Sequence, residues 1–134
     1  MTGYKILNKD RRGKQWGKPI TKLPGFHYSL DREYVDAAIG TEIPIDTEKC
    51  AHGFHFCDRM MDAIRFAPSV AGIPAEDCDL ENFVFVKVVA GGSVAMETID
   101  GIRSYRASHI RLVREYAKEE ALELARKELE EERK

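Results

Sequence analysis

The sequence predicts a single α+β domain of mostly antiparallel sheet, with one short helix after Cys57 and a charged C-terminal helix. Three observations predict this class. Short segments of alternating apolar residues are separated by turn residues, as in antiparallel sheets. The apolar spacing changes from two to three or four residues after Cys57, which indicates a helix. Residues 117–134 lack Gly and Pro and consist mainly of helix-favouring residues.

Length and composition exclude several classes of protein. A chain of 134 residues is long enough for one hydrophobic core. Its net charge of −2 gives no basis for attraction to nucleic acid or to a membrane surface. The first residues contain no apolar signal core, no apolar run is long enough to span a bilayer, and the three cysteines are an odd number. We therefore expect a reduced, cytoplasmic protein.

The first half of the chain is expected to form short strands. Residues 4–7 form the first, and the alternation of residues 26–30 predicts another. Residues 34–39 fit a helical turn and a strand equally well. Pro44 places residues 43–45 at a sheet edge or in a connection.

The central stretch changes from strand to helix at Asp58. Phe54 and Phe56 alternate with His55 and Cys57, so the two pairs face opposite sides of a short strand. Asp58 is expected to cap the helix that follows. The apolar face of that helix consists of Met60, Ala63, Ile64 and Ala67.

The second half begins with the clearest strand, residues 83–90, whose β-branched and aromatic content predicts a central place in the sheet. Gly91 and Gly92 are expected to end it, so that residues 93–99 form a separate strand. Asp100 and Gly101 predict a two-residue hairpin turn. Residues 107–115 fit a last strand poorly and a helix somewhat better.

We divide the chain into a domain of residues 1–116 and a charged helix of residues 117–134, which belongs to the same domain or extends it. The apolar stripe of the helix is thin: Ala121, Leu122, Ala125 and Leu129. Two interpretations stay open. The helix docks by one edge and is otherwise solvated, or it binds a partner and makes a homodimer, although the stripe is too short for a convincing coiled coil.

Cysteine and histidine gather in the central stretch. Cys50, His52, His55 and Cys57 are candidate zinc ligands, since thiolate and imidazole suit zinc. Only two residues separate the two ligand pairs, however, so a buried Cys57 beside a hydrogen-bonded His55 is favoured. Cys57 beside a histidine is also a candidate nucleophile, with Asp58 or Asp79 as the orienting carboxylate.

Basic residues form two local clusters. The first surrounds Trp16 and consists of Lys9, Arg11, Arg12, Lys14 and Lys18. The second consists of Arg103, Arg106, His109, Arg111 and Arg114. Nucleic-acid binding is disfavoured because the whole chain is not basic. If both clusters converge on His55, they would hold a nucleotide diphosphate or an acidic protein surface.

Several motifs together resemble an uncharacterised domain family of phages and prophages. They are Tyr4-Lys5-Ile6-Leu7, Phe26-His27-Tyr28, the Cys-x-x-Gly-Phe-His-x-Cys pattern that begins at Cys50, Gly92-Ser93-Val94, and the segment of residues 110–115. The resemblance covers roughly residues 4–116. It implies a phage or prophage origin but carries no activity.

A second stretch is similar to the strand and helix with which poly-ADP-ribose-polymerase-like ADP-ribosyltransferases stack the nicotinamide of NAD. The stretch begins at Gly53, and His55 would occupy the stacking position. The resemblance places Lys5 where that fold has a ribose-binding histidine. The catalytic glutamate would fall near Gly101, where the nearest carboxylates are Glu97 and Asp100.

Two functions are therefore expected. The first is a phage-encoded protein that binds a host or phage protein without catalysis and inhibits it. The second is an ADP-ribosyltransferase-like enzyme or NAD-binding protein. Its catalytic candidates are His55 and Glu97, and its cofactor-binding candidates are Lys5, Gly53, His55 and Arg106. The first function is favoured, because the resemblance lacks a placed carboxylate to stabilise a positively charged transition state.

Overall fold

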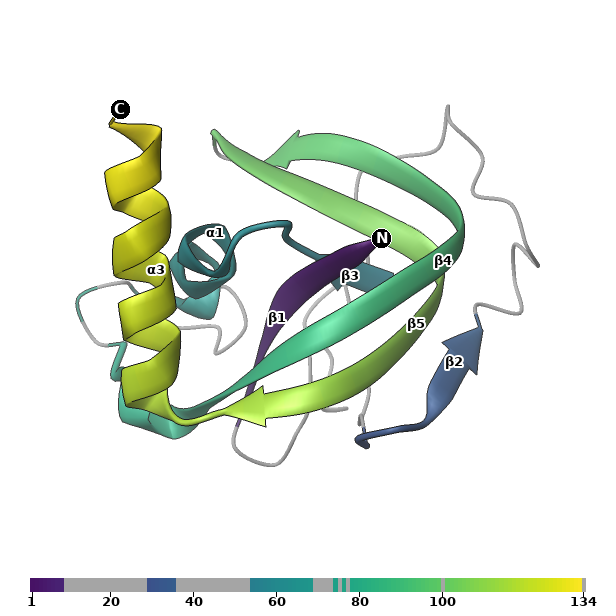
Figure 1. The fold of residues 1–134 in the computed structure, drawn as a ribbon, viewed down its shortest axis with the longest axis horizontal. Coiled ribbons are helices and arrows are strands. Elements are labelled where there is room, and N and C mark those ends of the chain that lie inside the picture. Colours follow the sequence, from purple (N-terminus) through teal and green to yellow (C-terminus); the bar gives the residue numbers. More distant parts are fainter. Residues whose placement is uncertain are drawn as a thin grey trace.

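The computed structural model describes residues 1–8, 29–35, 54–68, 74, 76, 78–99 and 101–133. Its elements in chain order are β1 (Thr2–Asn8), β2 (Glu33–Val35), β3 (Phe54–Phe56), α1 (Met60–Arg65), the 3-10 helix η2 (Leu80–Asn82), β4 (Phe83–Ile99), β5 (Ile102–Tyr116) and α3 (Lys118–Glu132) (Figure 1). Every pairing between these five described strands is antiparallel, so the predicted α+β class is confirmed. Residues 26–28 of the predicted strand 26–30, the segment 43–45 and the basic cluster around Trp16 lie outside the described residues.

One long hairpin, β4 and β5, organises the sheet (Figure 1). The prediction that Gly91 and Gly92 end a strand was wrong: β4 bends there and continues to Ile99, with a register shift between Gly91 and Val94. Gly92 has φ 69°, and a Cβ on it would lie 2.1 Å from Ser108 Oγ. Glycine therefore lets the strand bend at a bulge, after which pairing with β5 resumes at Val94.

Residues 107–115 belong to a strand, so the preference for a helix there was wrong. Both edges of β5 are occupied, by β4 on one side and by β2 and β3 on the other. Ile110 and Leu112 are buried while Arg111 between them is exposed, which is the period of a strand. Pairing on both edges overrides the weak local preference.

A single bridge closes four of the strands into a ring. β1 pairs with β4, β4 with β5, and β5 with β3. Tyr4 N donates to Cys57 O at 2.7 Å, and Cys57 N donates to Tyr4 O at 2.8 Å, which joins β1 to the end of β3. The ring gives the sheet an inner and an outer face.

Each face has its own hydrophobic core. The buried members of the inner core that the structure describes are all strand residues, among them Leu7, Phe56, Val86, Val88 and Leu112. The outer core lies between the sheet and the helices. It contains Ile6, Cys57, Met60, Ala63, Phe66, Phe83, Phe85, Ile102 and Ala121.

The helices α1 and α3, which are far apart in the sequence, contact each other. α1 begins after Arg59, so the prediction that Asp58 caps it was wrong. Asp58 Oδ2 instead accepts from Arg103 Nη2 at 2.7 Å. The backbone N–H groups of Met60 and Met61, in the first turn of α1, donate to the two carboxylate oxygens of Glu128 on α3, at 2.9 and 2.8 Å.

α3 confirms the predicted C-terminal helix, and it docks by one edge. Ala121 is buried, and Leu124 and Ala125 pack on the outer core. Leu122 and Leu129, the other large residues of the thin stripe, are exposed. No helix in the described part of the chain combines the length and the apolar character that crossing a bilayer requires.

Candidate functional site

Four polar residues gather on the outer face of the sheet, beside the core under α1. His55 on β3 lies directly across from Arg106 on β5, and Glu97 on β4 lies directly across from Ser104 on β5. Residues opposite each other share a face, so the four form one cluster, which we call the His55 patch. His55, Ser104 and Arg106 are buried. The chain thus brings together three of the residues that sequence analysis proposed for catalysis or cofactor binding.

A buried ion pair occupies the centre of the His55 patch. Arg106 Nε lies 2.7 Å from Glu97 Oε1, and the two side chains are only 3% and 7% exposed. Removing either partner would take the opposite charge away from a group that is shielded from water. The carboxylate that would serve a transferase is therefore already held by a guanidinium of the same chain.

The imidazole of His55 is kept neutral. Burial, then the charges of Lys5 and Arg106, lower its pKa from 6.5 to about 3. A general acid or base works best when its pKa lies near the operating pH. At neutral pH His55 is therefore not an imidazolium that could act as a general acid, and it is a very weak base.

The side chain of Lys5 contacts the backbone of His55. Its Nζ donates to the carbonyl oxygen of His55. Lys5 pairs with Val86 of the inner core and alternates with the outer-core residue Ile6, so it shares the inner face with Leu7. Burial lowers the pKa of Lys5 to about 8. This lysine therefore stabilises the path of β3 from the side opposite the His55 patch.

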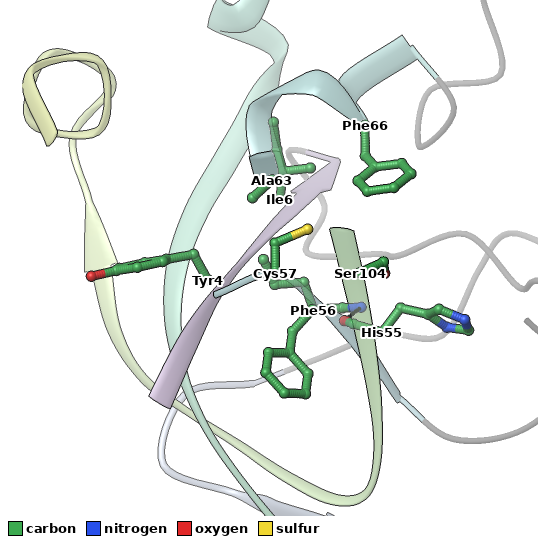
Figure 2. Close-up of a pocket in the computed structure, with 9 residues that line it drawn as sticks. Tyr4, Ile6, His55, Phe56, Cys57, Ala63, Phe66 and Ser104 are labelled. Carbon is green, nitrogen blue, oxygen red and sulfur yellow. Dashed lines mark hydrogen bonds between the residues drawn. The ribbon is translucent and has the colours of Figure 1, made fainter. Parts of the chain in front are cut away.

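Cys57 has the properties of a core residue. Its side chain points toward Ala63 and Phe66, away from the imidazole of His55 (Figure 2). Burial and the nearby carboxylate of Asp62 raise the pKa of its thiol to about 12. The nucleophile is the thiolate, which this environment suppresses at neutral pH.

A small cavity lies between the His55 patch and α1 (Figure 2). Its volume is about 40 Å³. It is lined by Tyr4, Lys5, Ile6, His55, Phe56, Cys57, Ala63, Phe66 and Ser104. A buried water needs about 10–15 Å³ in this measure, so the cavity has room for water.

The second basic cluster is divided among separate partners. Arg103 pairs with Asp58 at 2.7 Å, His109 Nδ1 lies 3.3 Å from Glu33, and Arg114 pairs with Glu120 at 2.7 Å. Arg106 joins the His55 patch. Alternation along β5 and these local ion pairs separate its members, so they do not form one anion site with His55.

The zinc prediction stays a prediction. Cys50, His52 and Gly53 lie outside the described residues. Within the described ranges, no three His, Cys, Asp or Glu side chains are placed to hold a metal ion. His55 and Cys57 point in different directions in Figure 2.

Sequence analysis did not identify Ser104 or the pairing of Glu97 with Arg106. The predicted two-residue turn at Asp100 and Gly101 contained the information that was needed. Once residues 99 and 102 flank a two-residue turn, the antiparallel register puts Glu97 opposite Ser104 and diagonal to Arg106.

Comparison of the chain with protein-family models, with curated proteins and with solved structures gave no match.

Proposed function

We propose that the chain is a phage- or prophage-encoded cytoplasmic protein that binds a host or phage protein and inhibits it by contact, without catalysis. Its scaffold would be related to the ADP-ribosyltransferases. The motif that begins at Cys50 supports the phage origin, and the strand and helix after Gly53 support the scaffold. The observation that carries the choice of binding over catalysis is the ion pair of Glu97 with Arg106.

An ADP-ribosyl transfer needs a carboxylate aimed at the ribose carbon, where positive charge develops. Glu97 is the described carboxylate of the His55 patch, and it is buried against Arg106 at 2.7 Å. The adjacent cavity is small, about 40 Å³, and most of its lining residues are apolar. The low pKa of His55 removes it as a proton donor at neutral pH. These three properties all favour protein binding over catalysis.

The test is an affinity capture from a bacterial host lysate, with and without NAD, read by peptide mass spectrometry. We expect a partner to be retained equally in both conditions, and equally by the Glu97→Gln variant, with no ADP-ribose mass on any peptide. Circular dichroism establishes that the variant is folded. An ADP-ribose mass that requires NAD and disappears with Glu97→Gln would overturn the proposal in favour of a transferase.

A second candidate is a nucleotide-binding protein without transferase activity. The observation that favours it is that two cationic residues lie next to His55 on β3. Arg106 lies across from it on β5, and Lys5 donates to its carbonyl oxygen. Calorimetric titration with NAD and with ADP-ribose tests it. Heat of binding that is lost in a folded Arg106→Met variant would support this candidate, and no heat with either ligand would exclude it.

A further inference from the structure

The cavity between the sheet and α1 is bounded mainly by apolar side chains. α1 and the residue that follows it contribute Ala63 and Phe66. The sheet side contributes Ile6 and Cys57, and all four residues are buried members of the outer core. The volume of about 40 Å³ is enough for about three waters at 10–15 Å³ each. These walls therefore suit a short apolar group such as a small alkyl chain.

One polar side chain in the wall of the cavity has an unpaired hydroxyl group. Ser104 on β5 is only 3% exposed. Within the part of the chain that the structure describes, no group forms a hydrogen bond with this hydroxyl. Figure 2 shows Ser104 between the ring of Phe66 and His55. A buried hydroxyl without a hydrogen bond costs free energy, and a ligand group that bonds to Ser104 would remove this cost.

The described residues around the cavity do not favour an ion. Lys5 is the one cation among the lining residues at neutral pH, and its Nζ is already bonded to the carbonyl oxygen of His55. The imidazole of His55 is neutral, since its pKa is about 3. Arg106 and Glu97 neutralise each other at 2.7 Å. An ion in this cavity would lose its hydration without adequate compensation, so the expected occupant is uncharged.

We propose that this cavity is a binding site for a small uncharged organic molecule with one hydroxyl or carbonyl group on a short alkyl body. The polar group of the ligand bonds to Ser104 Oγ, which can both donate and accept. The alkyl body lies against Ala63, Phe66 and Ile6. Because α1 forms one wall, the bound molecule also stabilises the docking of this helix on the sheet. Binding at this site does not require the partner protein of the proposed function.

A short alcohol, 2-propanol, is the probe that tests the site by nuclear magnetic resonance of the full chain. Nuclear Overhauser effects from its methyl protons to Ala63, Ile6 and Phe66 would locate it in the cavity. A titration gives its dissociation constant, which is expected in the millimolar range for so small a ligand. Ser104→Ala should weaken binding about fivefold, because one hydrogen bond is lost. Ser93→Ala is the matched control, since Ser93 is not a lining residue, and it should bind as wild type does.

Xenon distinguishes loss of the hydroxyl from loss of the cavity, since it binds in apolar cavities without a hydrogen bond. Ser104→Ala should bind xenon as wild type does. Ala63→Val adds volume to the wall that α1 forms, and it should exclude both xenon and 2-propanol. The proposal is overturned if wild type shows no Overhauser effects from 2-propanol to the lining residues, or if wild type and Ser104→Ala bind the alcohol equally. Binding of 2-propanol that Ala63→Val leaves unchanged would also overturn it.

Discussion

The carboxylate of Glu128 on α3 accepts the backbone N–H groups of Met60 and Met61 at the first turn of α1. α1 has six residues and no side-chain cap of its own. A helix of this length is not stable in isolation, and its first N–H groups need partners. The C-terminal helix therefore completes the helix that follows the central motif, and the two belong to one folding unit.

Replacing Glu128 is expected to destabilise the whole domain. Glu128→Ala removes both acceptors and should cost about 1 kcal/mol in the free energy of unfolding, as other helix-cap losses do. Glu128→Gln keeps one acceptor and should cost less. Urea denaturation measures both. Glu131→Ala, at an exposed position of the same helix, is the control and should behave as wild type. Equal effects of Glu128→Ala and Glu131→Ala would contradict the capping role.

The ion pair of Glu97 with Arg106 should show strong coupling. Glu97→Met or Arg106→Met alone leaves one buried charge and should cost roughly 3–5 kcal/mol. The double variant should be more stable than either single variant, since no charge is then left unpaired. A double-mutant cycle by urea denaturation measures the coupling. Additive costs would show that the two side chains act independently.

His55 should make the domain sensitive to acid. The folded state keeps the imidazole neutral down to a pKa of about 3, whereas an unfolded histidine takes up a proton near pH 6.5. Between these values the unfolded state binds more protons, so stability falls as the pH is lowered. The slope attributable to His55 approaches 1.4 kcal/mol per pH unit.

His55→Asn should remove this component. Its free energy of unfolding should fall less steeply than that of wild type from pH 6.5 downward, while the difference between the two proteins stays constant above pH 7. Denaturation curves at several pH values measure the slopes. Parallel profiles over the acid range would contradict a buried neutral imidazole.

The cysteines should differ in reactivity. Cys57 is buried and its thiol pKa is raised to about 12, whereas Cys78 is only half-buried. Iodoacetamide at pH 8 should therefore label Cys78 well before Cys57, as read from the masses of their peptides. Both should label together in concentrated urea, which is the control. Rapid labelling of Cys57 in the native protein would restore the nucleophile hypothesis.

Gly3 should be required where β1 meets β3. A Cβ on Gly3 would lie 2.5 Å from Cys57 O and 2.5 Å from Phe56 Cδ2. Gly3→Ala should therefore cost about 1–3 kcal/mol, because the backbone or the ring has to move. Gly91→Ala is the matched control, since nothing lies within 4 Å of its Cβ. Thermal unfolding compares the two, and equal melting temperatures would contradict the close approach.

The sequence predicted elements whose signals are local. The C-terminal helix is predicted by its content of helix-favouring residues. The turn at Gly101 is predicted because glycine readily adopts its φ of 78°. The bend at Gly92 and the strand at residues 107–115 were missed because pairing with distant segments decides them. For the candidate site, the sequence identified His55, Glu97 and Arg106 as candidate residues. That Glu97 faces Arg106 instead of His55 depends on the hairpin register, which no single segment contains.

The bridge between Tyr4 and Cys57 also constrains the order in which the chain acquires its structure. β1 is synthesised before the strands with which it pairs, yet Met1, just before it, bonds to Ala90 of β4 89 positions along the chain, and the contact of Lys5 with His55 spans 50 positions. Closing such long loops is entropically costly before other contacts form. The β4–β5 hairpin and α3 are local and can form sooner. β1 therefore has no strand to pair with until β4 has been made. We expect it to join the sheet late, and its pairing closes the ring.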